Sequence, residues 1–275
     1  MKTTTTQKHR TRVETAFERL KEKGEKALIT FITAGDPDLG TTKELIFTLE
    51  KSGADIIELG IPFSDPAADG PTIQLSSERA VKKGVHLSDV IGLVREVRET
   101  SEVPIVLFGY YNPIFSFGLK KFAKSARAAG ADGVLIVDLP PEEADDLKTE
   151  LDRVGMDLIF LLTPTSDEGR MRLVSGKASG FIYFVSVTGV TGARTELSAR
   201  LPSFVKKVRR FTDVPVGVGF GISTPEQAKE VSAYSDGVIV GSAIINIIAK
   251  NAGSRDLLKK VGSFVSALKG AINPG

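Results

Sequence analysis

Short apolar runs recur along the chain, and the stretches between them have apolar residues at helical spacing. Between Thr41 and Ser52, for example, Leu45 and Leu49 lie four positions apart among polar residues, as on one face of an amphipathic helix. The apolar runs predict strands at Leu28–Thr33, Asp55–Leu59, Ile105–Phe108, Gly133–Asp138, Leu158–Leu162, Phe181–Val185, Val216–Val218 and Gly237–Val240. Helices are predicted at Thr41–Ser52, Leu119–Ala129, Glu142–Val154 and Pro225–Val231. Strands that alternate with helices indicate parallel βαβ units.

Eight such strands in a chain of 275 residues predict an α/β fold of the (β/α)₈ TIM-barrel type. An open doubly wound sheet fits less well. Similar turns support the barrel, because Ser52–Asp55, Ala129–Gly133 and Tyr234–Gly237 each end a helix and lead into the next strand. In most of these turns glycine supplies the left-handed conformation that ends a helix, and aspartate supplies a hydrogen bond in the turn.

The N-terminal region predicts one element beyond the eight units. Arg12–Lys23 is predicted to form an extra amphipathic helix with Val13, Phe17 and Leu20 on one face. We expect this helix to cap the closed end of the barrel. After the second strand, Gly84–His86 divides the chain into two helices. We predict a polar, flexible leader at residues 1–10 and a single barrel domain at residues 11–275, because no stretch has the composition of a linker.

Composition narrows the possible functions. A hydrophobic content of 41% and a charged content of 25% are ordinary for a soluble globular protein. The net charge of +2 gives no indication of binding to nucleic acid or to an acidic membrane. The absence of cysteine excludes disulfides, thiolate catalysis and cysteine metal sites.

The lack of recognisable targeting and membrane-spanning segments favours a cytoplasmic location. The leader has no apolar core for a signal peptide, and no apolar run is long enough to span a membrane. We expect a cytoplasmic protein, or a plastid protein if the source is a plant, although no transit peptide is evident. Both histidines, His9 and His86, are expected at the surface, so a histidine metal site or catalytic triad is not expected.

Residues 55–74 hold the clearest candidate chemistry. Glu58 lies near the end of an apolar strand, where burial raises the pKa of a carboxyl group and makes it a candidate general acid or base. The alternative is an ion pair with an arginine or lysine. Asp65 and Asp69 follow in a loop rich in glycine and proline, where aspartate also commonly bonds its own backbone.

Glycines gather after the last three predicted strands. The segments are Thr188–Ala193, Gly219–Ser223 and Gly241–Ile244. Glycine lets a ligand approach the backbone, and helix N-termini present free N–H groups to an anion. These segments contain no lysine, so we predict a phosphate site made chiefly by backbone amides and the Ser242 hydroxyl. Each segment taken alone also fits a tight turn.

The segment Glu58–Gln74 closely resembles the signature of the tryptophan synthase α subunit family. Agreement continues through Phe31–Pro37, Tyr110–Pro113, Tyr183 with Thr188–Ala193, Gly219–Ser223 and Gly241–Ser242, so the resemblance runs from about Arg12 to Gly270. It implies retro-aldol cleavage of indole-3-glycerol phosphate to indole and glyceraldehyde 3-phosphate in tryptophan biosynthesis.

The resemblance also implies a role for each matching residue. Glu58 would be the acid–base carboxyl group, and Asp69 would stabilise the charge that develops on the indole nitrogen. The indole pocket would be lined by Phe31, Phe108, Leu135, Tyr183 and Phe220. The phosphate would be held by Thr191, Gly192, Gly221, Gly241 and Ser242.

The resemblance further implies a partner. Members of the family dock on a pyridoxal-phosphate β subunit in an α₂β₂ heterotetramer, so we expect no metal or cofactor in this chain itself. The matching contact positions are Asp65, Pro66, Asn112 and Pro140. The apolar residues of the predicted loop Tyr110–Phe117 favour an exposed interface, although they could instead fold inward over the barrel mouth.

Three other functions stay open at this point. A stand-alone indole-releasing lyase would use the same residues without a partner. Another phosphate-binding barrel enzyme, such as a phosphoribosyl isomerase, would need an acid at a different strand end, where Asp138 is the other candidate and the adjacent Pro140 and Pro141 suggest a scaffold. A non-catalytic regulatory partner would not need Glu58 and Asp69 together.

Overall fold

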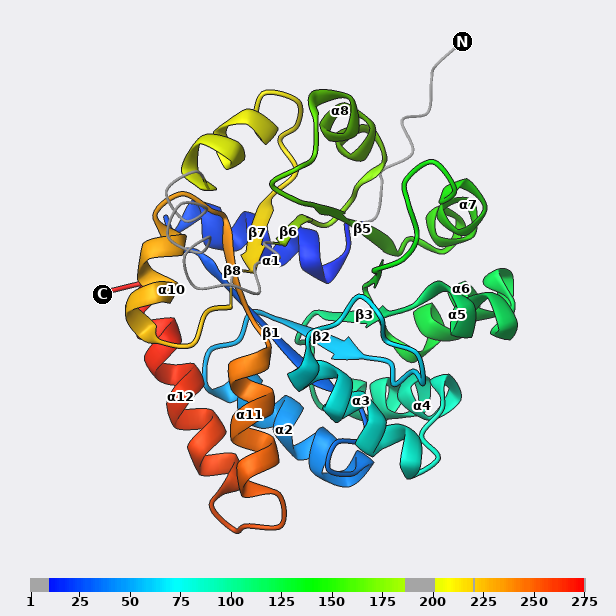
Figure 1. Ribbon diagram of the computed structural model, residues 1–275, viewed down its shortest axis with the longest axis vertical. Coiled ribbons are helices and arrows are strands. Elements are labelled where there is room, and N and C mark those ends of the chain that lie inside the picture. Colours follow the sequence, from blue (N-terminus) through cyan, green and yellow to red (C-terminus); the bar gives the residue numbers. More distant parts are fainter. Residues whose placement is uncertain (1–9, 186–200, 220, 275) are drawn as a thin grey trace.

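The eight strands close into one parallel barrel (Figure 1). The computed structural model describes residues 10–185, 201–219 and 221–274. Each strand pairs with the next, and β8 pairs with β1. The strands are β1 (Ala27–Thr33), β2 (Ile56–Gly60), β3 (Ile105–Gly109), β4 (Gly133–Ile136), β5 (Asp157–Leu162), β6 (Ile182–Val185), β7 (Val216–Gly219) and β8 (Gly237–Val240). The predicted TIM-barrel fold is confirmed. The predicted division at residue 10 falls at the border of the described residues and stays a prediction.

Helices surround the barrel, and most predicted boundaries differ from the observed ones by three residues or fewer. Their bounds are α1 (Arg12–Glu22), α2 (Leu39–Lys51), α3 (Pro71–Lys82), α4 (Leu87–Arg98), α5 (Tyr111–Phe117), α6 (Leu119–Ala129), α7 (Asp145–Val154), α8 (Glu168–Lys177), α10 (Pro225–Ser232), α11 (Ser242–Asn251) and α12 (Leu257–Ile272). The expected break at Gly84–His86 separates α3 from α4, and His86 is exposed as predicted. None of the helices in the described ranges is long and apolar enough to cross a membrane.

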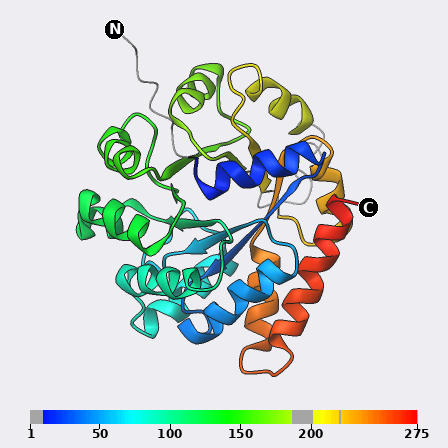
Figure 2. The same cartoon turned by 180° about the vertical axis from the view of Figure 1, so that it is seen from behind.

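Helix α1 lies across the N-terminal end of the strands (Figure 2). It begins with a capping box, in which the Thr11 side chain accepts the Glu14 N–H and the Glu14 side chain accepts the Thr11 N–H. Its apolar face packs into the bottom of the barrel, where the Phe17 and Phe181 rings lie 5.8 Å apart. The expected cap on the closed end is confirmed, and it excludes water from the lower half of the interior.

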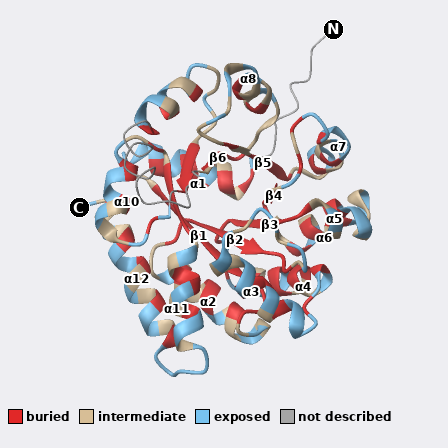
Figure 3. Ribbon diagram, viewed as in Figure 1, coloured by how far each residue is buried: buried red, intermediate tan, exposed pale blue. Residues whose placement is uncertain are grey.

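The barrel interior has an apolar lower layer beneath a more polar upper layer. Side chains alternate between the two faces of a strand, and the inward ones form the lower layer together with α1. Its strand residues are Ala27, Ile29, Ile56, Val106, Leu135, Ile159 and Ile239. The outward side chains pack under the helices, which expose only their far sides (Figure 3). The upper layer is therefore the part of the interior that ligands can reach.

Three aspartates fix the register of neighbouring strands. Asp55, Asp132 and Asp236 lie directly before β2, β4 and β8. Each accepts a backbone N–H from the start of the preceding strand at 2.8–2.9 Å. Asp132 is fully buried and also pairs with Arg98 and Arg12. The predicted turn hydrogen bond thus reaches across to the adjacent strand and holds the strand ends level, so that the upper layer has a defined geometry.

Candidate active site

Glu58 projects into the upper layer of the barrel from the middle of β2. It lies opposite Phe31 on β1 and Val106 on β3. The residue is only 1% exposed, and neither carboxylate oxygen has a hydrogen-bond partner among the described residues. Burial alone raises its pKa to about 8, because the charged form loses its hydration. The alternative ion pair is not found in the described part of the chain, and Glu58 therefore remains the candidate acid–base group.

Asp69 lies on the loop between β2 and α3, above Glu58. It is half-buried, and burial raises the pKa of its carboxyl group to about 6. The Tyr110 hydroxyl donates a hydrogen bond of 3.0 Å to the Asp69 Oδ2 atom, which opposes part of that shift. Asp69 is therefore ionised in a pH range where Glu58 still holds its proton.

Tyr110 is a site residue that the sequence analysis assigned only to a partner surface. It follows β3 directly, is 5% exposed, and packs its ring 5.2 Å from that of Phe63. Its oxygen accepts the Ala68 N–H at 3.1 Å while it donates to Asp69. One phenol thus ties the Asp69 loop to the rim of the barrel. The available signal was a tyrosine directly after a strand that neighbours the one carrying Glu58.

The loops around the site are anchored by further polar contacts. The Gln74 side chain donates to the Asp69 carbonyl at 2.9 Å, and the Ser77 hydroxyl accepts the Phe63 N–H at 2.8 Å. In the loop after β1, the buried Asp36 accepts two hydrogen bonds from Arg79 on α3. These contacts hold the first two loops against α3 and keep Asp69 over the barrel mouth.

A cavity of about 10 Å³ lies beside Asp69 and Tyr110, and Glu58 is not among the residues that line it. Its lining includes Phe31, Phe108, Asp69 and Tyr110. The Phe31 and Phe108 rings meet edge to face, with centroids 5.0 Å apart. Because this volume holds about one water molecule, an indole ring can enter only if side chains or the Asp69 loop move outward.

Tyr183 and Leu135, the other described members of the predicted indole pocket, lie at different depths. Tyr183 is half-buried on β6, and its pKa is raised by burial and by the charges of Glu58 and Asp69. The three groups therefore share one electrostatic environment. Leu135 is fully buried in the apolar lower layer and is not among the residues that line the small cavity. Its place in the indole pocket stays a prediction.

Glycines at the ends of β7 and β8 pack closely against the side chains of Tyr183 and Phe31. A Cβ atom on Gly219 would lie 2.5 Å from the Tyr183 hydroxyl, so only glycine fits there. Gly241 lies against Phe31 and precedes Ser242, the first residue of α11. Gly221 has a positive φ of 55°. Thr191, Gly192 and Phe220 lie outside the described residues, and no described group of His, Asp and Glu could hold a metal ion.

The strand-terminal acid considered for a different barrel enzyme has a structural role. Strand β4 ends at Ile136, two residues earlier than predicted, because the chain turns at Val137 and Asp138. The exposed Asp138 carboxylate accepts the Tyr111 N–H at 2.8 Å, at the start of α5. Asp138 therefore supports a helix end, which agrees with the interpretation of this segment as scaffold.

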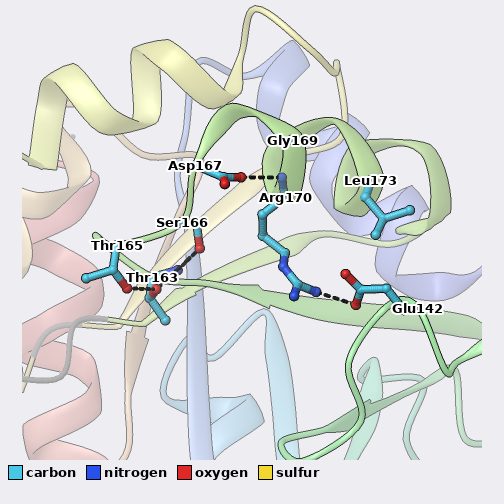
Figure 4. A pocket seen from close by; sticks show the side chains of 8 residues that line it. All are labelled: Glu142, Thr163, Thr165, Ser166, Asp167, Gly169, Arg170 and Leu173. Atoms are coloured by element: carbon cyan, nitrogen blue, oxygen red, sulfur yellow. Dashed lines mark hydrogen bonds and ion pairs between the residues drawn. The ribbon is translucent and has the colours of Figure 1, made fainter.

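A larger hollow of about 490 Å³ lies beyond the end of β5 and is separate from these residues (Figure 4). Its polar side chains bond to one another: Arg170 pairs with Glu142 at 2.6 Å, and Thr163 bonds to Thr165 at 2.9 Å. None of the residues predicted to bind substrate lines it. The residues at the ends of β1 to β3 are the better candidate site, because they include the buried acid.

Comparison with known proteins decides the family. The family profile described as tryptophan synthase alpha chain matches residues 17–273. The chain belongs to the tryptophan synthase alpha chain family. It is 57% identical to the tryptophan synthase alpha chain of Geotalea uraniireducens, over 95% of this chain and 97% of that one. It is 59% identical to that of Geobacter sulfurreducens, over 95% and 98%.

Solved structures agree with this assignment. The crystal structure of tryptophan synthase subunit alpha from Legionella pneumophila has a TM-score of 0.88 and 43% identity, covering 95% of this chain and 98% of that one. A structure of Mycobacterium tuberculosis tryptophan synthase has a TM-score of 0.88 and 33% identity, with 97% and 100% covered. The expected family is confirmed, and with it the activity of a lyase that cleaves indole-3-glycerol phosphate in tryptophan biosynthesis.

The burial of Glu58 predicts a pH dependence of stability. Its pKa of about 8 in the folded chain lies above the ordinary 4.5, so between these values the folded state holds a proton that the unfolded state has released. Stability should therefore fall as pH rises through this range, by about 1.4 kcal/mol per unit at most. Urea unfolding at a series of pH values should show this fall in the wild type. In Glu58→Gln the free energy of unfolding should fall less steeply with pH, because only the contribution of Asp69 remains. Equal slopes in the two proteins would contradict the raised pKa of Glu58.

The Tyr110 hydrogen bond predicts a second pH effect. It favours the ionised form of Asp69, so Tyr110→Phe should raise the pKa of Asp69 above about 6 and move the acid limb of kcat/KM to higher pH. Tyr234→Phe, a half-buried tyrosine before β8 at the opposite end of the barrel, is the matched control and should leave the profile in place. An unchanged acid limb in Tyr110→Phe would show that the bond does not act on Asp69.

Proposed function

We propose that Glu58 and Asp69 perform the cleavage of indole-3-glycerol phosphate in this chain. The observation that supports this most is the buried carboxyl group of Glu58, which has no hydrogen-bond partner among the described residues and whose pKa of about 8 lets it give and take a proton near neutral pH. Asp69 supplies a negative charge at the mouth of the same interior. Two carboxyl groups in different environments thus have different protonation states, as two distinct roles require.

The reaction can be written with these two groups alone. Protonated Glu58 donates its proton to C3 of the indole ring, and the ring nitrogen becomes positively charged. Ionised Asp69 accepts a hydrogen bond from that N–H and stabilises the charge. The Glu58 carboxylate then takes the proton of the glycerol hydroxyl next to the ring, and the bond from C3 to the glycerol chain breaks. The electron pair of that bond re-forms the C2–C3 double bond of the ring, and the π electrons of the C2–N bond return to the ring nitrogen. Indole and glyceraldehyde 3-phosphate are released, and Glu58 is protonated again.

We also propose that the phosphate binds at the ends of β7 and β8. The N-terminus of α11 at Ser242, which directly follows Gly241, supports this position. In the bound substrate, the glycerol chain would span the distance from the phosphate at Ser242 to the indole ring at Asp69. Phosphate and indole would then be held on opposite sides of Glu58, which places the breaking bond near its carboxyl group.

Substitution of the two carboxylates tests the proposal. Glu58→Gln should lower the rate of indole release by at least about 100-fold, the lower range for general acid–base catalysis. Asp69→Asn should also be severely impaired, because a neutral amide cannot balance a positive ring nitrogen. Glu78→Gln, an exposed glutamate on α3, is the control and should release indole at the wild-type rate. Near-normal turnover by Glu58→Gln in a folded protein would refute its role.

For the partner, we propose docking on a tryptophan synthase β subunit in an α₂β₂ complex in the cytoplasm. The pyridoxal phosphate would be held by that subunit, with no cofactor in this chain. Phe115 supports the docking face, because its side chain on α5 is 61% exposed, whereas the neighbouring Ile114 is buried. The segment predicted as a loop is thus a short helix, with one apolar side facing inward and Phe115 facing outward. An exposed aromatic residue of this kind is typical of an interface.

Association with a purified β subunit tests the partner. Phe115→Ser and Asn112→Asp should each weaken co-purification while indole release by the isolated chain changes little. Val81→Ser removes another exposed apolar side chain, at the C-terminal end of α3, which is the end farther from the site. This variant should bind the β subunit like the wild type. A β subunit that neither binds nor raises kcat/KM would instead favour the stand-alone indole-releasing lyase.

A further inference from the structure

Thr33, the last residue of β1, has a buried hydroxyl group that the described residues leave without a partner. The residue is 2% exposed, and its Oγ1 atom makes no hydrogen bond within the described ranges. A buried hydroxyl without a partner is unfavourable. Thr33 also lines the small cavity together with Asp69 and Tyr110. A buried polar group at a ligand cavity points to a partner that the ligand supplies.

The barrel geometry shows which part of a ligand would pass Thr33. Residues two apart on a strand share a face, so Thr33 faces the interior with Phe31, which lies opposite Glu58. Thr33 itself lies opposite Gly60, whose side-chain position is taken by the Phe31 ring, and both Thr33 and Gly60 line the small cavity. Strand β1 lies between β8, which leads to Gly241, and β2, which holds Glu58. A chain that runs from a phosphate at Gly241 to the acid on β2 therefore crosses the end of β1.

We propose that Thr33 is a substrate-binding residue whose hydroxyl forms a hydrogen bond with the glycerol chain of the bound substrate. This inference rests on the proposed function, because it takes the phosphate end and the acid as assigned above. The bond would hold the hydroxyl-bearing carbons between the phosphate and Glu58. It would also satisfy the Thr33 hydroxyl only when the substrate is present, so that its contribution appears in binding and catalysis and not in the stability of the free protein.

The same strand offers a matched reference in Thr30. Its Oγ1 atom is also buried and without a partner among the described residues. Thr30 lies an odd number of positions from Thr33, however, and shares its face with Leu28 and Ile32, which pack in the outer core beneath the helices. Replacement of either threonine by valine removes a hydroxyl and keeps the shape, so the two variants differ only in the side of the sheet that changes.

The experiment compares Thr33→Val and Thr30→Val with the wild type in both reaction directions. For Thr33→Val, kcat/KM for indole-3-glycerol phosphate should fall about tenfold or more, as for a lost hydrogen bond in a binding site. In the reverse reaction, the KM for glyceraldehyde 3-phosphate should rise while the KM for indole stays unchanged. Neither variant should have a lower thermal unfolding temperature, and Thr30→Val should keep wild-type kinetics.

Several results would overturn the inference. Wild-type kinetics in Thr33→Val would show that the hydroxyl does not contact the substrate. A rise in the KM for indole alone would show that it contacts the indole ring and not the glycerol chain. Loss of activity together with a lower unfolding temperature, or an equal loss in Thr30→Val, would indicate a structural role. Absence of cleavage by the wild type would instead refute the proposed function itself, on which this inference rests.

Discussion

The burial of the Glu58 carboxyl group, which has no hydrogen-bond partner in the described ranges, is the constraint on which the proposed site depends. Glu58 is held on β2, which is paired on both sides, with β1 and with β3. Below it, helix α1 and the apolar lower layer exclude water. The missing hydration raises the pKa of Glu58 to about 8, and the proposed acid–base chemistry depends on that value. The closed end of the barrel, which binds nothing in the proposed reaction, thereby sets the chemistry at the open end.

Asp69 differs from Glu58 in its position, its burial and its hydrogen bonding, and each difference suits its proposed role. It is on a loop, is only half-buried, and receives a hydrogen bond from Tyr110 that favours its charged form. A rigid strand suits a group that must transfer a proton to a fixed atom. A loop suits a group that must move aside for the indole ring and then return, because the present cavity of about 10 Å³ cannot hold that ring.

The short segment after β3 connects the site with the proposed partner face. Tyr110 bonds to Asp69, and α5, which starts at the next residue, exposes Phe115. A partner that changes the position of α5 would act on Tyr110 and through it on Asp69. Any such coupling is reciprocal, so a ligand that moves Asp69 would alter affinity for the partner by the same factor. Asp138, which accepts the Tyr111 N–H, holds this segment to β4 and so belongs to the same connection.

The sequence by itself determined the fold class, the order and approximate bounds of most elements, and the position of Glu58. These features follow from local periodicity and from the cost of placing an acid in an apolar strand. It also indicated the family through residues 58–74. The helical form of α5 and the end of β4 at Ile136 were not predicted. The bond from the Tyr111 N–H to Asp138 joins the two segments across 27 residues and has no signal in local periodicity.

Only the tertiary structure decided which side chains meet. Tyr110 and Asp69 are far apart in sequence and are joined because β2 and β3 end at the same edge of the barrel. Leu135 was placed by resemblance in the indole pocket, and its depth in the lower layer emerged only from the register of the strands. The Thr33 hydroxyl, which has no partner among the residues that the structure describes, had no signal in the sequence, since a strand threonine looks the same whether or not it has a partner. Hydrogen bonding and burial are properties of neighbours in space, and the closure of the barrel decides those neighbours.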